Sequence, residues 1–301
     1  MNVVFRIRGG LLIVIALQDE FHTVFHPARQ GNISDWIAHA VWRALRRLSP
    51  RKLTFAGPMA FVLIVAYWTA SIIIGFALIY LPELPQSFVF ARGLDSAGSS
   101  GFPGALNVSV GGLITLSTGI YSNRPWLGLL LGLESIVGFA LLTASVSWIL
   151  SIYPILEHRR SLAHEATLLH FSEVNGIRRL ADLSDTDVNT ILLGLASQVS
   201  TSRHELMQFP ITYYFYESEA KSALAGILPY IAEIAEQNLK RKGGAGLAAA
   251  VLGGAVDDYL KWIAGKYLKR NFSSRYGILQ AFAEDQLREP VHPPQPVSRA
   301  A

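Results

Sequence analysis

The chain has 301 residues, of which 51% are hydrophobic and 16% charged, and its formal net charge is +4. This composition is too apolar for an ordinary water-soluble domain, and the basic residues lie beside apolar runs, which argues against a nucleic-acid partner. The sequence contains no cysteine, which excludes disulfides, thiolate metal sites and cysteine nucleophiles. Charged residues return after about Glu157, so we expect a membrane half followed by an aqueous half.

The first apolar segment, residues 3–24, carries Asp19 and Glu20 in its second half. Arg6 and Arg8 precede an apolar run as in a signal peptide, but no small-residue cleavage site follows. We therefore expect an uncleaved anchor helix, which either crosses the membrane or lies in its interface.

The next segment, residues 36–52, alternates apolar and basic side chains at helical spacing. This pattern predicts an amphipathic helix on the inner leaflet, with its basic side chains facing lipid headgroups. The basic residues are Arg43, Arg46, Arg47, Arg51 and Lys52.

Two long apolar runs follow, residues 55–82 without any charge and residues 126–156 interrupted only by Glu134. Each is longer than the roughly 20 residues that a helix needs to cross a membrane. Basic residues precede the first run and follow the second, so the positive-inside rule puts both flanks in the cytoplasm and the connection, residues 83–125, outside. The two runs are predicted to form an antiparallel pair of spanning helices.

Within the outer connection, residues 105–116 are again apolar but too few to span, which predicts a half-buried helix that returns to the same side. Non-helical backbone at membrane depth is tolerated only where it is buried in protein or lines a watery path. A pore loop is therefore the simplest interpretation. The alternative is that its serine and threonine side chains only pack helices by hydrogen bonding.

The motif that ends this loop resembles the selectivity filter of two-helix potassium channels and their bacterial relatives, which reads T-L-T-T-V-G-Y-G-D. The matching residues here are Thr115, Leu116, Ser117, Thr118, Gly119, Ile120, Tyr121, Ser122 and Asn123. The resemblance covers about residues 57–156 and implies an outer helix, a pore loop and an inner helix. It also implies a homotetramer that conducts monovalent cations, with potassium expected.

Both filter glycines of that family are replaced here, by Ile120 and Ser122. A left-handed residue other than glycine costs about 1–2 kcal/mol, and a β-branched side chain suits it poorly. We therefore expect a changed and wider filter, lined partly by side chains, and do not assume potassium selectivity. Asn123 also removes the acidic charge of the family's outer mouth.

Glu134 and Gly138 in the second run resemble an E-x-x-x-G pattern near the start of the family's inner helix. An intramembrane carboxylate points to an ion pathway or gate, and a structural bond to the back of the loop explains it equally well. Gly138 is either a hinge or a point of close helix packing. Continuation of this helix into residues 157–171 would link the pore to the aqueous half mechanically.

The aqueous half shows helical periodicity, for example Val188, Leu192, Leu195 and Val199 behind a predicted capping serine, Ser184. No useful run has period two, so we predict an all-helical domain. The tail from Glu289 is proline-rich and predicted to be disordered.

Three features of this half were considered for chemistry. The glycine-rich residues 243–254 lack a phosphate-loop ending, which favours a flexible turn and small-residue packing. The cluster Tyr213, Tyr214, Phe215 and Tyr216 is interpreted as core or interface packing, with a ligand pocket as the minority interpretation. No histidine or aspartate spacing matches a metal site, and no catalytic residue is proposed.

The sequence thus predicts an all-α membrane protein with a potassium-channel-like pore module. We expect an anchor and basic linker (residues 1–54), a pore domain (55–156), a helical cytoplasmic domain (157–288) and a disordered tail (289–301). The expected function is the pore-forming subunit of a tetrameric cation channel of the cell (inner) membrane, potassium-conducting or weakly selective and gated through the cytoplasmic helical domain. No cofactor is expected, and a further expected partner is an unknown cytoplasmic ligand. The alternative is a non-conducting membrane sensor or scaffold with the same fold.

Overall fold

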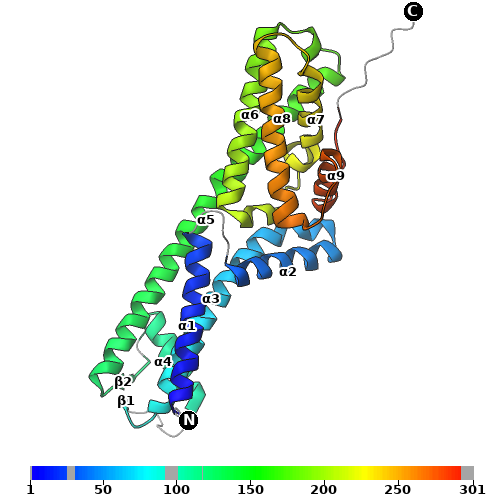
Figure 1. Ribbon diagram of the computed structural model, residues 1–301. Helices are drawn as coiled ribbons and strands as arrows, with labels where there is room; N and C mark the ends of the chain where they lie inside the picture. The colour runs from blue at the N-terminus through cyan, green and yellow to red at the C-terminus, as the bar shows by residue number, and fades with distance from the viewer. Residues whose placement is uncertain (1, 26–30, 92–100, 117, 293–301) are drawn as a thin grey trace, which may run out of the picture. The chain divides into compact units, whose positions relative to one another are not determined.

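The computed structural model describes residues 2–25, 31–91, 101–116 and 118–292 (Figure 1). It is 81% helical, in agreement with the helical class predicted from the sequence. The described part also holds two short strands, β1 (Phe88–Phe90) and β2 (Ile120–Ser122). The sequence analysis missed them, because three residues are too few to show an alternating pattern.

The chain divides into two compact units, Met1–Val41 with Pro58–Ser151 and Trp42–Gly57 with Ile152–Ala301. The sequence interpretation grouped residues up to 54 with the N-terminal anchor. Trp42 and the residues after it instead belong to the second unit, because the indole of Trp42 is buried against the rings of Tyr213 and Tyr214, at centroid distances of 6.1 and 5.9 Å.

Two of the described helices could cross a membrane by length and composition, in the segments Arg51–Glu83 and Pro125–Val174. The first contains α3 (Ala56–Tyr80) and the second is α5 (Pro125–Val174). Both predicted spanning runs are therefore confirmed as long apolar helices. α5 is one helix of 50 residues that continues through Pro154, so the predicted continuation over residues 157–171 is also confirmed.

The N-terminal helix α1 (Asn2–Val24) lies antiparallel against α3. A Cβ added at Gly9 would lie 2.3 Å from the carbonyl oxygen of Gly75, so this crossing needs glycine. Further along, Asp19 of α1 contacts Trp68 of α3. At the opposite end, Arg6 forms an ion pair with Glu83.

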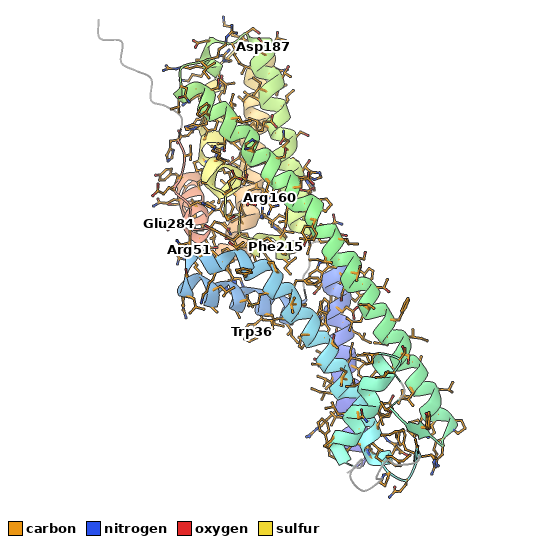
Figure 2. All side chains as sticks on the ribbon, turned by 180° about the vertical axis from the view of Figure 1, so that it is seen from behind. Trp36, Arg51, Arg160, Asp187, Phe215 and Glu284 are labelled. Atoms are coloured by element: carbon orange, nitrogen blue, oxygen red, sulfur yellow. The ribbon has the colours of Figure 1, made fainter. Side chains whose placement is uncertain are left out.

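Helix α2 (Asn32–Leu48) has the amphipathic character predicted from the sequence. Its buried face comprises Ala38, Val41, Trp42 and Leu45, whereas its arginines are exposed. Trp36 is 69% exposed and projects away from the helix (Figure 2). A 3-10 helix, η1 (Pro50–Phe55), then leads directly into α3.

The second unit is a helical bundle around the end of α5, in agreement with the prediction for the aqueous half (Figure 1). Its main helices are α6 (Asp185–Gln208), α7 (Leu224–Asn238), α8 (Gly244–Ile263) and α9 (Arg275–Asp285). Ser184 caps α6 as predicted, accepting a 3.2 Å hydrogen bond from the backbone N–H of Asp187.

Short helical turns connect these elements. They are η2 (Leu81–Glu83) in the first unit, and η3 (Leu180–Asp182), η4 (Pro210–Tyr214), η5 (Ala220–Ser222) and a π-helical turn at Ala264–Leu268 in the second.

The glycine-rich residues 243–254 were predicted to combine a flexible turn with small-residue packing, and the turn is confined to Gly243. Helix α8 begins at Gly244, and only Gly243 adopts a turn conformation, with φ of 65°. The buried alanines of α8, including Ala245, Ala248 and Ala249, bury little side-chain volume and so permit close approach of its neighbour α6.

Candidate functional site

The two ends of the loop between α3 and α5 lie next to each other. Strand β1 pairs with β2 in antiparallel register, with Phe88 opposite Ser122 and Phe90 opposite Ile120. The N–H of Ala91 also donates to the carbonyl of Gly119 at 2.8 Å. Because β1 precedes the loop helix and β2 follows it, this pairing holds the two ends of the loop side by side.

The loop helix α4 (Gly101–Leu113) has 13 residues. At 1.5 Å per residue it is about 20 Å long, which is shorter than the roughly 30 Å hydrocarbon core of a bilayer. Its buried residues include Ala105, Val108, Ser109 and Leu113. A helix of this length is therefore too short to cross a bilayer.

Glu134 of α5 holds α4 in place from behind. Its carboxylate is fully buried and accepts hydrogen bonds from the hydroxyls of Tyr80, at 2.8 Å, and of Ser109. Three helices therefore meet at one carboxylate, since Tyr80 ends α3, Ser109 lies on α4 and Glu134 lies on α5. Of the two roles that the sequence left open, the structural bond to the back of the loop is the one observed.

Gly138 lies one turn further along α5, against the end of α4. A Cβ at this position would lie 2.1 Å from the carbonyl oxygen of Leu113, which is far inside van der Waals contact. A Cβ at Gly112 would similarly lie 2.7 Å from the Glu134 carboxylate. Gly138 thus serves close packing between α5 and α4, the second of the two roles proposed for it.

Helix α4 ends at Thr115 in a Schellman motif. The N–H of Leu116 donates to the carbonyl of Gly111 at 2.8 Å, and the N–H of Thr115 points to the carbonyl of Gly112 at 3.3 Å. This motif needs a left-handed residue, and Thr115 has φ of 57° where glycine is usual. Ile114 and Leu116 on either side are 56% and 64% exposed and form an apolar tip.

The residues predicted to form the filter fall into two groups in the structure. Thr115 and Thr118 lie at the tip, where Thr118 packs against Gly111 of α4. Ile120, Tyr121 and Ser122 form strand β2. Ser117 lies outside the described residues.

The segment that follows α4, residues 119–123, is hydrogen-bonded to the segment that precedes it, residues 87–91. Gly119, with φ of 73°, has its carbonyl bonded to Ala91, and the N–H of Asn123 donates to Ser87 at 3.1 Å. The hydroxyl of Ser122 lies 2.9 Å from the carbonyl oxygen of Arg124. At least one carbonyl of the expected filter is therefore engaged within the same chain.

Asp19 is a second buried carboxylate, and the sequence analysis did not assign it a role. It accepts 3.0 Å hydrogen bonds from the backbone N–H of Ile33 and the indole of Trp68, and a further bond from the Ser34 hydroxyl. It thereby satisfies one free backbone N–H at the start of α2, that of Ile33, and ties this end to α3. The available signal was the pair of acidic residues, Asp19 and Glu20, that directly follows an apolar run.

The described residues contain no group of three histidine, aspartate or glutamate side chains placed to hold a metal ion. Comparison with models of protein families, with curated proteins and with solved structures finds no match.

Proposed function

We propose that this chain is the pore-forming subunit of a cation channel, in which copies of the loop built on α4 surround a common axis. The observation that carries the proposal is the pairing of β1 with β2, which brings the two ends of the intervening segment together, as a re-entrant loop requires. A short helix that enters and leaves at one side is tolerated in a membrane where it lines a watery path. One loop per chain requires a ring of chains, and the family resemblance favours four.

A ring of copies also accounts for the apolar surface of α5. Leu129, Ile136, Phe139 and Leu142 are between 63% and 73% exposed, on the helix that passes behind the loop. Such a face is stable against lipid or against another copy of the chain. Lipid supplies no hydrophobic driving force for helix association, so these side chains would have to pack closely against the neighbouring copy.

The path would be narrowest at the tip of α4, where Ile114, Thr115 and Leu116 are exposed. Filter residues of the potassium-channel type use unbonded backbone carbonyls, and the carbonyl of Gly119 already accepts a bond from Ala91. We therefore propose weak selectivity among monovalent cations, set by the width and polarity of the tip.

The second unit would control the path through α5, whose continuous helix leads from the loop into that unit. The basic residues before α3 and after the apolar part of α5 favour a cytoplasmic position for this unit in the inner membrane. No bond-making chemistry is proposed for the protein.

The rival proposal is a non-conducting sensor or scaffold. It is favoured by the apolar side chains of Ile114 and Leu116 at the tip, because a narrow ring of apolar side chains closes a path by dewetting.

Cation flux into liposomes that contain the purified protein tests the proposal. We expect flux above that of empty liposomes, loss of flux in Leu116→Lys, which adds a positive charge at the tip, and retained flux in the neutral variant Leu116→Gln. Mass measurement of the intact oligomer should give four chains. Four chains with no flux of any monovalent cation, at any voltage or pH, would establish the scaffold instead.

A further inference from the structure

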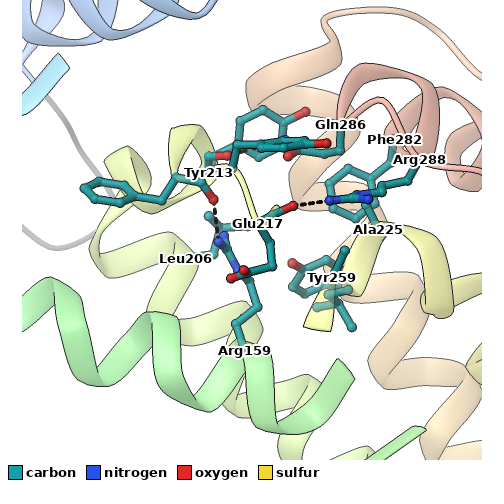
Figure 3. Close-up of a pocket in the computed structure, with 13 residues that line it drawn as sticks. Arg159, Leu206, Tyr213, Glu217, Ala225, Tyr259, Phe282, Gln286 and Arg288 are labelled. Atoms are coloured by element: carbon teal, nitrogen blue, oxygen red, sulfur yellow. Dashed lines mark hydrogen bonds between the residues drawn. The ribbon is translucent and has the colours of Figure 1, made fainter. Parts of the chain in front are cut away.

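A small cavity lies inside the second unit, among α5, α7, α8 and the segment that follows α9 (Figure 3). Its volume is about 30 Å³, enough for a small polyatomic ion or a few water molecules. Its polar lining comprises Arg159, Tyr216, Glu217, Tyr259, Gln286 and Arg288.

Arg159 supplies a partly buried positive charge to this cavity. Its guanidinium donates hydrogen bonds of 2.8 and 2.7 Å to the carbonyl oxygens of Thr212 and Phe215. Both acceptors are neutral, so they position the guanidinium without cancelling its charge.

Arg288 approaches the same space from the C-terminal side. Its guanidinium lies 5.0 Å from the centre of the Tyr216 ring and donates to the carbonyl oxygen of Glu217. Its Nε is buried and has no hydrogen-bond partner among the described residues. A buried donor of this kind is costly unless something else occupies it.

The charges around the cavity do not balance. The carboxylate of Glu217 pairs with Arg160, an exposed residue outside the cavity lining. The lining itself holds two guanidinium groups, those of Arg159 and Arg288, beside this one carboxylate. The nearby carboxylate of Asp285 is engaged by Arg46 at 2.8 Å. The cavity therefore keeps a surplus of positive charge in a partly dry setting, where its effect is strong.

Tyr259 adds a neutral donor. Burial raises the pKa of its phenol to about 12, with the nearby Arg159 acting in the opposite direction, so the hydroxyl keeps its proton at neutral pH. Figure 3 shows this hydroxyl and the guanidinium groups of Arg159 and Arg288 directed toward the region around Glu217.

We propose that this cavity is a binding site for a small oxyanion, with Arg288 and Arg159 as its charge partners and Tyr259 as a hydrogen-bond donor. A guanidinium group presents paired N–H donors that match the two oxygens of a carboxylate or phosphate. The cavity volume limits the ligand to the size of acetate or inorganic phosphate.

The site is built into the segments next to both spanning helices. Arg159 belongs to α5 itself, and Tyr213 on the cavity wall packs against Trp42, which precedes α3. The hydroxyl of Tyr213 also donates a 2.6 Å bond to Asp285, the partner of Arg46. This regulatory role rests on the proposed channel function. An anion that binds one conformation of the second unit more tightly than another would shift the population toward that conformation and so regulate the pore.

Isothermal titration of the purified full-length protein in detergent, with phosphate, acetate and chloride in turn, tests the site. We expect phosphate or acetate to bind in preference to chloride. In Arg288→Gln, which removes a charged hydrogen bond, the affinity for the oxyanion should fall by about tenfold or more. Ala225→Leu fills the cavity without changing charge and should also abolish binding. Arg270→Gln, an exposed matched control, should bind as the wild type does.

No binding of either oxyanion, or equal binding by wild type and Arg288→Gln, would overturn the inference. The titration requires no ion flux, so its outcome is separate from that of the proposed channel function. Phosphate added to liposomes should alter flux through wild type and Arg270→Gln but not through Arg288→Gln. Binding without flux would leave the site established and the channel proposal refuted.

Discussion

The hydroxyl of Tyr80 donates a 2.8 Å hydrogen bond to the carboxylate of Glu134, which joins the end of α3 to α5 behind the loop helix. Both side chains are fully buried, and Ser109 of α4 completes the cluster. A buried carboxylate needs such donors, because its desolvation is otherwise uncompensated. The position of α4 therefore depends on two hydroxyl groups that reach one acid.

Tyr80→Phe removes one of these donors and keeps the ring. We expect the free energy of unfolding to fall by about 1–3 kcal/mol, since the Glu134 carboxylate loses a buried partner. Thermal unfolding of the purified protein measures the change. Tyr153→Phe on α5 is the control, because that side chain is 60% exposed; equal losses in the two variants would contradict the prediction.

Thr115→Gly should stabilise the protein. Thr115 is held in the left-handed conformation that ends α4, and glycine adopts it without the steric penalty of a side chain. We expect a gain of about 1 kcal/mol in the free energy of unfolding, after the entropy cost of glycine. Thr143→Gly, inside α5, should instead lose about 0.3 kcal/mol, the difference between threonine and glycine in a helix interior. Destabilisation by both substitutions would show that the Schellman motif does not form.

Asp19 and Trp68 should be energetically coupled. Asp19→Ala and Trp68→Phe each remove one partner of the 3.0 Å bond between the carboxylate and the indole, so the stability lost by the double variant should be smaller than the sum of the two single losses. We expect a coupling energy of about 0.5–3 kcal/mol from a double-mutant cycle followed by thermal unfolding. Strict additivity would mean that the bond contributes nothing.

The Tyr213–Asp285 bond predicts a loss of stability at high pH. Burial, reinforced by the Asp285 charge, raises the pKa of Tyr213 well above its ordinary value near 10, so the folded protein keeps a proton that the unfolded chain releases. The contribution of the Tyr213 hydroxyl to the free energy of unfolding is therefore complete below pH 10 and declines above it. The stability advantage of wild type over Tyr213→Phe should shrink by about 1.4 kcal/mol for each pH unit above 10. An advantage that stays constant up to pH 11 would contradict this.

The basic residues beside α3 predict a preference for anionic lipid. Arg46 is paired with Asp285, whereas the other exposed cations have no ion pair among the described residues. These residues are Arg43, Arg47, Arg51 and Lys52. Each should contribute about 1 kcal/mol near an anionic surface.

Changing all four to glutamine should remove the extra thermal stability that wild type shows in nanodiscs of anionic over zwitterionic lipid. A matched control replaces the same number of exposed cations elsewhere in the second unit, which are Lys240, Lys242, Lys261 and Arg270. Loss of lipid dependence in the control as well would point to net charge alone.

The sequence by itself determined the helical class, the two long apolar helices, the amphipathic α2 and the cap of α6 by Ser184. These features depend on local periodicity and on contacts between residues a few positions apart, so a short window of sequence is enough to predict them. The short length of the apolar run before Thr115 likewise predicted a helix that cannot span.

Only the tertiary structure decided how those pieces are joined. It paired Ile120–Ser122 with Phe88–Phe90, although the sequence had assigned the later segment to an ion filter. It gave Thr115 the left-handed position that the family pattern assigns to glycine elsewhere, and it brought Trp42 into the helical domain. Each of these outcomes depends on partners far away in the chain, such as Gly119 with Ala91 or Trp42 with Tyr213. No local pattern encodes such pairs, because their free energy exists only once the chain has folded.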